Sequence, residues 1–220
     1  MKLLHVVATP RADGSNTLRI SHSYLEAVRA EHPDVQIETL NLFTTNLLTL
    51  EGQNLESKYS LMIGQPLDPE HVDSWEGVEA LITQFLAADI CLISAPMWNL
   101  SIPYALKYYI DAIVQPGYLF SYNEQGVPVG CCEGKELVCI TTRGGDYSVG
   151  SPMHAFDLQE SYLRAIFGFV GISDIQFVHA QPMDIGSDLR EAAIGVAIGE
   201  VRALVAEVGG RPGLELAATA

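Results

Sequence analysis

The sequence predicts an α/β protein: a doubly wound, five-stranded parallel sheet with helices on both faces. Three observations predict this fold. Short apolar runs alternate along the chain with longer segments of helical periodicity, the pattern of successive βαβ units. Most of these runs are apolar throughout, which is typical of strands that are covered on both faces. The chain has 220 residues, and 48% of them are hydrophobic, enough for the core of a single domain.

The predicted strands are short runs bounded by turn residues. The first covers residues 3–8 (LLHVVA), and the second, residues 36–41 (QIETLN), alternates between polar and apolar side chains. Three more follow at residues 89–95, 136–142 and 175–180. Parallel strands joined through helices imply right-handed crossovers between them.

The predicted helices occupy the segments between these strands. Residues 16–31 place Leu18, Tyr24 and Leu25 on a shared face, and Ser15 directly before them is a suitable N-cap. The remaining helical patterns cover approximately residues 73–88, 103–114, 155–170 and 188–208.

Two segments depart from simple alternation. Residues 42–68 form an irregular insertion that is long for a strand-to-helix connection, and such connections usually carry function or a partner surface. Residues 118–134 contain FSYNEQGVPVG, which predicts a hairpin. We expect a single domain over residues 1–208 and a flexible C-terminal tail over residues 209–220.

Composition excludes several classes of protein. With 12 basic and 27 acidic residues the formal net charge is −15, which argues against binding to nucleic acids or anionic membranes. No stretch approaches the roughly 20 apolar residues of a membrane span, and the apolar run at the N-terminus is too short for a secretion signal.

The four cysteines form no CxxC pair, so we expect a reducing, cytoplasmic setting. Cys131 and Cys132 are adjacent, and a plain turn is favoured there over a redox pair. The six histidines show no metal-ligand spacing, which predicts no metal site.

Hydroxyl groups and small residues follow the first predicted strand and lead into the first helix. Thr9, Ser15 and Thr17 offer hydroxyl groups, and the N-terminus of a helix offers free N–H groups and a favourable dipole for an anion. The loop lacks the GxGxxG and P-loop patterns. It therefore predicts a phosphate site of another kind, although an ordinary capped helix start explains the same residues.

The third predicted strand ends in Pro96-Met97-Trp98-Asn99. A large aromatic side chain at a sheet terminus offers a flat apolar wall, and an asparagine offers both a donor and an acceptor. The segment can bracket a planar heterocycle, and core packing of Met97 and Trp98 is the simpler alternative.

A glycine-rich loop follows the fourth predicted strand. Gly144 and Gly145 allow the backbone to approach a ligand closely, and Tyr147 supplies a further ring. Arg143 could neutralise charge or donate to a carbonyl group, or it could be a surface arginine beside a turn. Because ligands of open α/β sheets bind at the carboxyl ends of the strands, the three loops together predict a flat, phosphorylated cofactor, and FMN fits best.

At these residues the sequence resembles the FMN-dependent NADH-azoreductases, homodimeric flavodoxin-like enzymes related to the NAD(P)H quinone reductases. The likeness extends from about residue 2 to about residue 205, and its specific part is the stretch PMWNLSIP at residues 96–103. The resemblance implies a flavodoxin-like sheet with strand order 2-1-3-4-5. It also implies FMN as cofactor, NADH or NADPH as electron donor, quinone or azo acceptors, and a homodimer with FMN near the interface.

The resemblance also implies roles for individual residues. We expect contacts with FMN from a set that spans all three loops, and a substrate pocket that includes Phe120 and Tyr147. The expected FMN set is Thr9, Arg11, Ser15, Asn16, Thr17, Pro96, Met97, Trp98, Asn99, Leu100, Thr142, Arg143, Gly144 and Gly145. Family members commonly carry Phe at the position of Leu100 and often Tyr at the position of Trp98, a difference that bears on substrate range more than on FMN binding.

The expected reaction is a two-step transfer in which NAD(P)H reduces the flavin and a quinone or azo compound then removes the electrons. The flavin N5 carries the chemistry, so no side chain is needed as a dedicated acid or base. Two alternatives remain at this point: a flavodoxin-like electron carrier that does not oxidise NADH, and a binding module without flavin. We also expect FMN affinity to fall in Arg143→Ala and Thr17→Val, and to change little when a distant lysine such as Lys2 is replaced.

Overall fold

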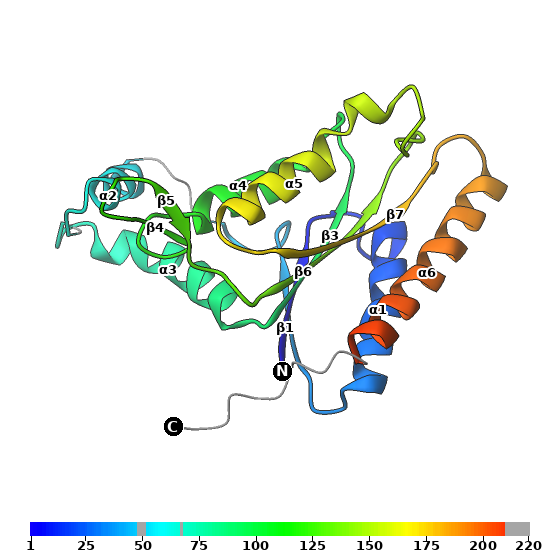
Figure 1. The fold of residues 1–220 in the computed structure, drawn as a ribbon, viewed down its shortest axis with the longest axis horizontal. Coiled ribbons are helices and arrows are strands. Elements are labelled where there is room, and N and C mark those ends of the chain that lie inside the picture. The colour runs from blue at the N-terminus through cyan, green and yellow to red at the C-terminus, as the bar shows by residue number, and fades with distance from the viewer. Residues whose placement is uncertain (48–51, 67, 210–220) are drawn as a thin grey trace.

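The computed structural model describes residues 1–47, 52–66 and 68–209. A central parallel sheet is covered by helices on both faces (Figure 1). No helix in these ranges is long and apolar enough to cross a membrane. The thiols of all four cysteines are free; Cys131 is exposed and the other three are buried.

The five predicted strands are confirmed, and all neighbouring pairs are parallel. Their order in the sheet is β2-β1-β3-β6-β7, which is the expected order 2-1-3-4-5 when the separate hairpin is not counted. The observed bounds are β1 Lys2–Val7, β2 Gln36–Asn41, β3 Ile90–Pro96, β6 Glu136–Thr142 and β7 Asp174–Ala180.

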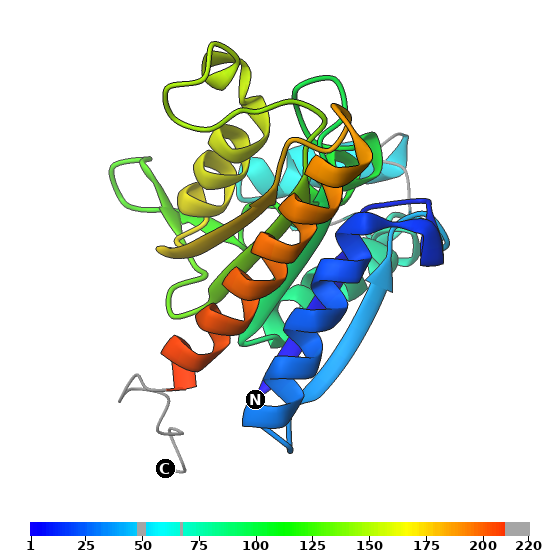
Figure 2. The ribbon, with the colours of Figure 1, turned by 90° about the vertical axis from the view of Figure 1, so that its right-hand side faces the viewer.

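The helices form two layers because each strand presents alternate side chains to opposite faces of the sheet. Leu3 of β1 packs with Ile20 of one helix and Ile194 of another, whereas its neighbour Leu4 packs on the opposite face with Phe85. The first layer contains α1 Asn16–Glu31 and α6 Ser187–Gly209, which lie side by side in Figure 2. The second contains α3 Val72–Ala87, α4 Tyr104–Ile113 and α5 Leu158–Phe169.

The expected irregular insertion contains a helix that the sequence analysis did not predict. Helix α2 covers Gln53–Met62, while residues 48–51 and 67 of the same segment lie outside the described residues. Its buried positions are Asn54 and Ser57, and its apolar side chains Tyr59 and Met62 are exposed. Apart from Leu61, which is partly buried against the core, the apolar residues form no buried stripe within the chain, so no amphipathic pattern marked this helix in the sequence. Residues 210–220 of the expected tail also lie outside the described residues.

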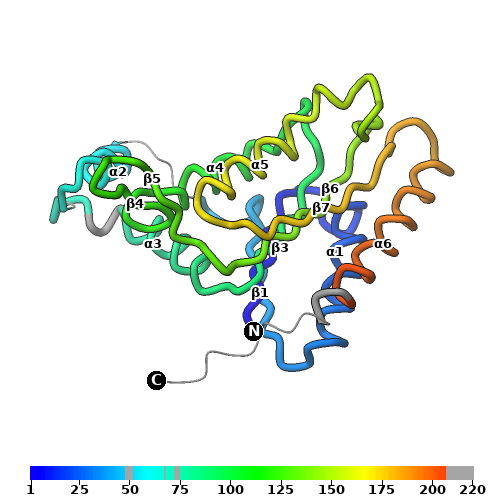
Figure 3. Tube along the Cα trace, in the orientation of Figure 1, coloured from blue at the N-terminus to red at the C-terminus, as the bar shows by residue number. Residues whose placement is uncertain are grey.

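The predicted hairpin is confirmed. Strands β4 Phe120–Tyr122 and β5 Pro128–Gly130 pair antiparallel as a separate small sheet, away from α1 and α6 (Figure 3). Gly130 allows this hairpin to pack against the residues that follow α5, because a Cβ atom at position 130 would overlap backbone atoms of Val170 and Gly171.

The fourth predicted helix begins later than expected. Residues 154–156 form a separate 3-10 turn, and Asp157 then caps α5 by accepting hydrogen bonds from the backbone N–H groups of Gln159 (3.1 Å) and Glu160 (3.0 Å). Asp157 lies at the carboxyl end of β6, because it forms an ion pair of 2.8 Å with Arg143, the residue that follows this strand.

Candidate functional site

A cleft of about 390 Å³ lies at the carboxyl ends of the strands. It joins the three loops that the sequence analysis singled out, together with the loop after β7 and the first turn of α6. Its lining residues are Thr9, Pro10, Arg11, Ser15, Asn16, Thr17, Pro96, Met97, Trp98, Thr142, Arg143, Gly144, Met183, Asp184 and Arg190. The volume lies within the usual range for small-molecule and cofactor sites.

The loop before α1 presents hydroxyl and N–H groups at one end of the cleft. Ser15 is the N-cap, since its Oγ accepts from the N–H of Leu18 at 3.3 Å, and it lies 3.2 Å from Oγ1 of Thr9. The first N–H groups of a helix have no partner within the helix, so those of Asn16 and Thr17 are available to a ligand. This end of the cleft therefore suits an anion.

Hydrogen bonds connect the three loops beneath the cleft. The hydroxyl of Thr17 lies 2.7 Å from that of Thr142, which joins α1 to β6. The N–H of Met97 donates to the carbonyl of Thr142 at 2.8 Å, which joins the loop after β3 to the same strand. The relative positions of the three loops are therefore set by the sheet itself.

A tight turn presents Trp98 at the cleft. The backbone groups of Trp98 and Ser101 exchange two hydrogen bonds of 2.9 and 3.0 Å, and the intervening Asn99 and Leu100 have φ values of 48° and 72°. Positive φ at both central residues is the geometry of a type I′ turn. Asparagine tolerates it readily, whereas for leucine it costs about 1–2 kcal/mol. The structure holds Leu100 there in part through its carbonyl, which accepts from the N–H of Leu158 at 3.1 Å.

Two aromatic neighbours support the indole of Trp98. The ring of Phe43, which follows β2, lies 5.9 Å from it, and the ring of Tyr104 at the start of α4 lies 6.1 Å from it. The sequence analysis did not identify Phe43 because the segment after β2 showed no recognisable pattern. Neither Asn99 nor Leu100 is among the residues that line the cleft, although both shape the turn that presents Trp98.

The loop after β6 approaches the cleft through its backbone. The N–H groups of Met183 and Asp184 donate to the carbonyl of Gly144, both at 3.1 Å, so the loop after β7 lies directly against it. A Cβ atom at Gly144 would lie 2.5 Å from Oδ2 of Asp184, so a larger residue here would require the exposed side chain of Asp184 to move. Gly145 lies one residue beyond the lining and faces the ring of Tyr147.

The side chain of Arg143 differs from the expectation. It is 1% exposed, and its Nη1 forms an ion pair of 2.8 Å with Asp157. Burial lowers the pKa of the guanidinium, and the carboxylates of Asp157 and Glu160 raise it. The charge predicted to face a ligand is thus largely neutralised within the protein, because Asp157 caps the adjacent helix at this point.

Gln159 is a buried link that the sequence analysis missed. Its side-chain N–H donates to the carbonyls of Ala95 (3.4 Å) and Pro96 (3.1 Å), and its Oε1 accepts from Nε of Arg143 at 3.3 Å. It is fully buried and ties the end of β3 to the loop after β6. The available signal was a polar residue in the first turn of a predicted helix, which is ordinarily exposed.

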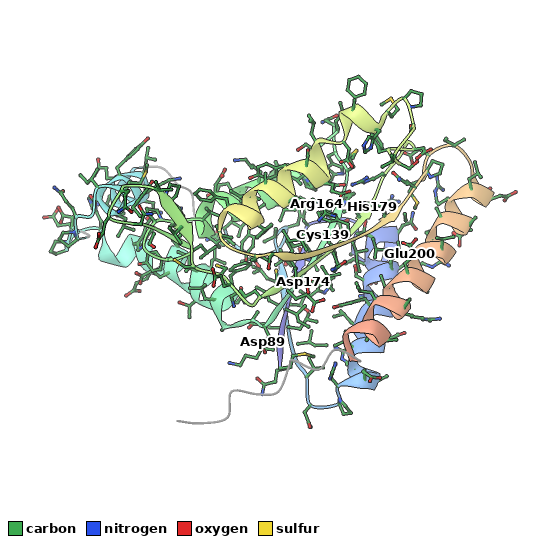
Figure 4. All side chains as sticks on the ribbon, in the orientation of Figure 1. Asp89, Cys139, Arg164, Asp174, His179 and Glu200 are labelled. Atoms are coloured by element: carbon green, nitrogen blue, oxygen red, sulfur yellow. The ribbon has the colours of Figure 1, made fainter. Side chains whose placement is uncertain are left out.

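A second polar network lies behind this link, between α5 and β7. Glu160 accepts hydrogen bonds from His179 (2.8 Å) and Arg164 (2.7 Å), and the two donors are labelled at the α5–β7 junction in Figure 4. The hydrogen bond from His179 is the largest factor that lowers the pKa of Glu160 to about 2. Nδ1 of His179 lies 2.7 Å from the hydroxyl of Thr141 on β6, which extends the network to the sheet.

A third network lies under the start of α1. Nε2 of His5 lies 2.7 Å from Oγ of Ser94, which lies 2.6 Å from Oγ of Ser21; the latter donates to the carbonyl of Thr17 at 2.9 Å. Burial lowers the pKa of His5 to about 4, and the charge of His22 adds to this effect. His5 is thus a neutral, hydrogen-bonded core histidine, as its position in a strand suggested.

The structure does not bring the two expected substrate-pocket residues to the cleft of this chain. Phe120 lies on the hairpin, 4.9 Å from the ring of Phe169, and Tyr147 is 9% exposed in the loop after β6. Neither lines the cleft. Conversely, the loop after β7 contributes Met183 and Asp184, and the first turn of α6 contributes Arg190. The sequence analysis missed these residues because no motif marks that segment. In the described ranges no three His, Cys, Asp or Glu side chains gather in a way that could hold a metal ion.

Comparison with known proteins agrees with this architecture. A family model described as "Flavodoxin-like fold" matches residues 1–205. The chain is 33% identical to FMN-dependent NADH:quinone oxidoreductase 3 of Pseudomonas fluorescens over 96% of this chain and 98% of that protein. It is 36% identical to the FMN-dependent NADH:quinone oxidoreductase of Laribacter hongkongensis over 93% and 100%.

Among solved structures, an FMN-dependent NADH-azoreductase from Bacillus anthracis in complex with FMN has a TM-score of 0.84 and 27% identity, covering 95% of this chain and 99% of that one. The match to the family model and the two enzymes that align over nearly their whole length lead to one conclusion: the chain belongs to the flavodoxin-like family that includes the FMN-dependent NADH:quinone oxidoreductases.

Proposed function

We propose that this protein is an FMN-dependent NADH:quinone oxidoreductase. The observation that carries the proposal is the cleft, where an anion-binding helix start, an aromatic wall and an open glycine backbone meet at the carboxyl ends of the strands. The names of its relatives point to the same cofactor and donor. When bound, FMN supplies the two-electron chemistry between a nicotinamide and a quinone.

The residues present fit this cofactor. The hydroxyls of Ser15 and Thr17 and the first N–H groups of α1 suit the phosphate, and Met97 and Trp98 offer an apolar surface to a flat ring. The backbone at Gly144 can approach the polar edge of that ring. The protein's contribution is then binding, orientation and electrostatics.

No side chain of the cleft is arranged as a dedicated acid or base. Among the described lining residues the titratable groups are Arg11, Arg143, Asp184 and Arg190. Arginines remain protonated, and Asp184 is exposed at the rim. Protons therefore come from water in this proposal, and backbone N–H groups stabilise negative charge.

We further propose that donor and acceptor use the cleft in turn, so that NADH leaves before a quinone or an aromatic azo compound binds. Donor and acceptor would both bind in the cleft beside the aromatic wall of Trp98, so they cannot bind there together. Initial rates at several fixed acceptor concentrations then give parallel lines in double-reciprocal plots, and intersecting lines would rule this scheme out.

A homodimer with the cofactor near its interface is part of the proposal. Tyr104, which contacts Trp98 at the cleft, is 71% exposed, and α2 and the residue after it leave Tyr59 58% and Ile63 70% exposed. Several exposed apolar side chains of this size indicate an interaction surface. Four free cysteines support a reducing, cytoplasmic setting.

One experiment separates this proposal from the two alternatives. The purified protein is supplied with FMN, freed of excess, and mixed anaerobically with NADH. We expect a yellow protein that NADH bleaches and a quinone restores. Colour that NADH does not bleach indicates an electron carrier, and failure to retain FMN indicates a binding module without flavin.

A further inference from the structure

Three arginines line the cleft, and the structure places their charges differently. Arg143 is buried and paired with Asp157, as described above. Arg11 is exposed in the 3-10 region before α1. Arg190 belongs to the first turn of α6, and its side chain is 39% exposed. Arg190 is thus a cation at the cleft that is neither buried nor in the loop before α1.

A backbone contact orients the guanidinium of Arg190. Its Nε donates to the carbonyl of Met183 at 2.7 Å, which ties the side chain to the loop beside Gly144. Its Nη2 lies 4.0 Å from Oδ1 of Asp184, beyond hydrogen-bonding distance, and that carboxylate is 80% exposed. The Nη groups, which carry four of the five guanidinium N–H donors, therefore form no hydrogen bond with the described residues.

The same turn of α6 lies beside the start of α1. Glu191, the next residue, forms an ion pair of 2.8 Å with Arg19 in the first half of α1, and the two helices run side by side in Figure 2. Arg190 lines the same cleft as Ser15, Asn16 and Thr17. Its oriented and incompletely neutralised charge therefore lies at the same cleft as the helix start that suits an anion.

We propose that Arg190 binds the phosphate of FMN. The inference rests on the proposed function and assigns to α6 the charge that the sequence analysis assigned to Arg143. A guanidinium whose Nε is already held presents its remaining N–H groups in a fixed plane, which suits phosphate oxygens. A local cation also offsets the repulsion that a chain with a net charge of −15 exerts on a dianion.

The test compares the binding of FMN with that of riboflavin, which lacks the phosphate. Dissociation constants are measured by quenching of flavin fluorescence for the full chain and for Arg190→Met. We expect Arg190→Met to weaken FMN binding about tenfold, as for loss of a charge-assisted hydrogen bond, and to change riboflavin binding less than about twofold. Arg190→Lys keeps the charge without the fork and falls between the two. Added salt weakens FMN binding more in the wild type than in Arg190→Met.

Arg202→Met is the matched control, because it removes an exposed arginine from the same helix at a position outside the cleft. We expect it to bind FMN as the wild type does. Unchanged FMN affinity in Arg190→Met, an equal loss for riboflavin, or an equal loss in Arg202→Met would each overturn the inference. A wild type that binds no FMN would instead refute the proposed function itself.

Discussion

Replacing Asp157 with asparagine removes the nearest negative charge from the buried guanidinium of Arg143. The Arg143 side chain is 1% exposed and that of Asp157 is 8% exposed, so water cannot replace the lost partner. Asparagine is as good an N-cap as aspartate and keeps an oxygen for the N–H groups of Gln159 and Glu160, so the start of α5 is preserved. The substitution therefore isolates the charge.

The expected cost follows from this geometry. Removing one partner of a buried ion pair destabilises a protein by about 3–5 kcal/mol. Glu160 lies 3.9 Å from Nη2 of Arg143 and compensates part of the charge, which places the expected loss near the lower end, at about 3 kcal/mol. We also expect the unpaired Arg143 to shift the loop after β6, which would lower the affinity for FMN.

The assay is urea unfolding at fixed protein and FMN concentrations. Asp111→Asn is the control, because its ion pair with Lys107 is 2.6 Å long but about half exposed, and we expect a loss of about 0.5 kcal/mol or less. Adding Arg143→Met to Asp157→Asn should restore part of the lost free energy, since no buried charge then remains. A loss in Asp157→Asn no larger than that of the control would refute the reasoning.

Three further predictions concern other parts of the fold. The pKa of His5 is about 4 in the folded protein and 6.5 ordinarily, so below about pH 6.5 unfolding takes up a proton, and stability decreases as the pH is lowered. Urea unfolding should therefore show a loss of about 2 kcal/mol between about pH 7.5 and about pH 5, and this loss should be absent in His5→Gln. Gly130→Ala should lower the free energy of unfolding by about 1–3 kcal/mol, because the added methyl group overlaps the backbone at Gly171; a change within about 0.5 kcal/mol would contradict the docking of the hairpin. Thr17→Val should weaken FMN binding about tenfold in fluorescence titrations, since it removes a cleft hydroxyl that also bonds Thr142 at 2.7 Å, whereas Lys2→Ala serves as the unaffected control.

The sheet and most of its helices could be predicted because their signals are local. Apolar runs such as residues 136–142 mark strands wherever they lie, and a hydroxyl at Ser15 marks a helix start without knowledge of its surroundings. The three loops could be associated because the carboxyl ends of parallel strands share one edge. Helix α2 escaped this reasoning because most of its apolar side chains, such as Tyr59, are exposed, whereas its buried positions are the polar Asn54 and Ser57.

The sequence by itself determined the architecture, the edge of the sheet that holds the cleft and the residue types that suit a phosphorylated planar cofactor. Only the tertiary structure decided that Arg190 keeps its charge available there and that Arg143 does not. Arg143 follows a strand that ends at the cleft, but the cap of α5 brings Asp157 to 2.8 Å from its guanidinium. Arg190, distant in the sequence, reaches the cleft because α6 packs along α1. Neutralisation depends on neighbours that are remote along the chain, and periodicity and motifs carry no information about them.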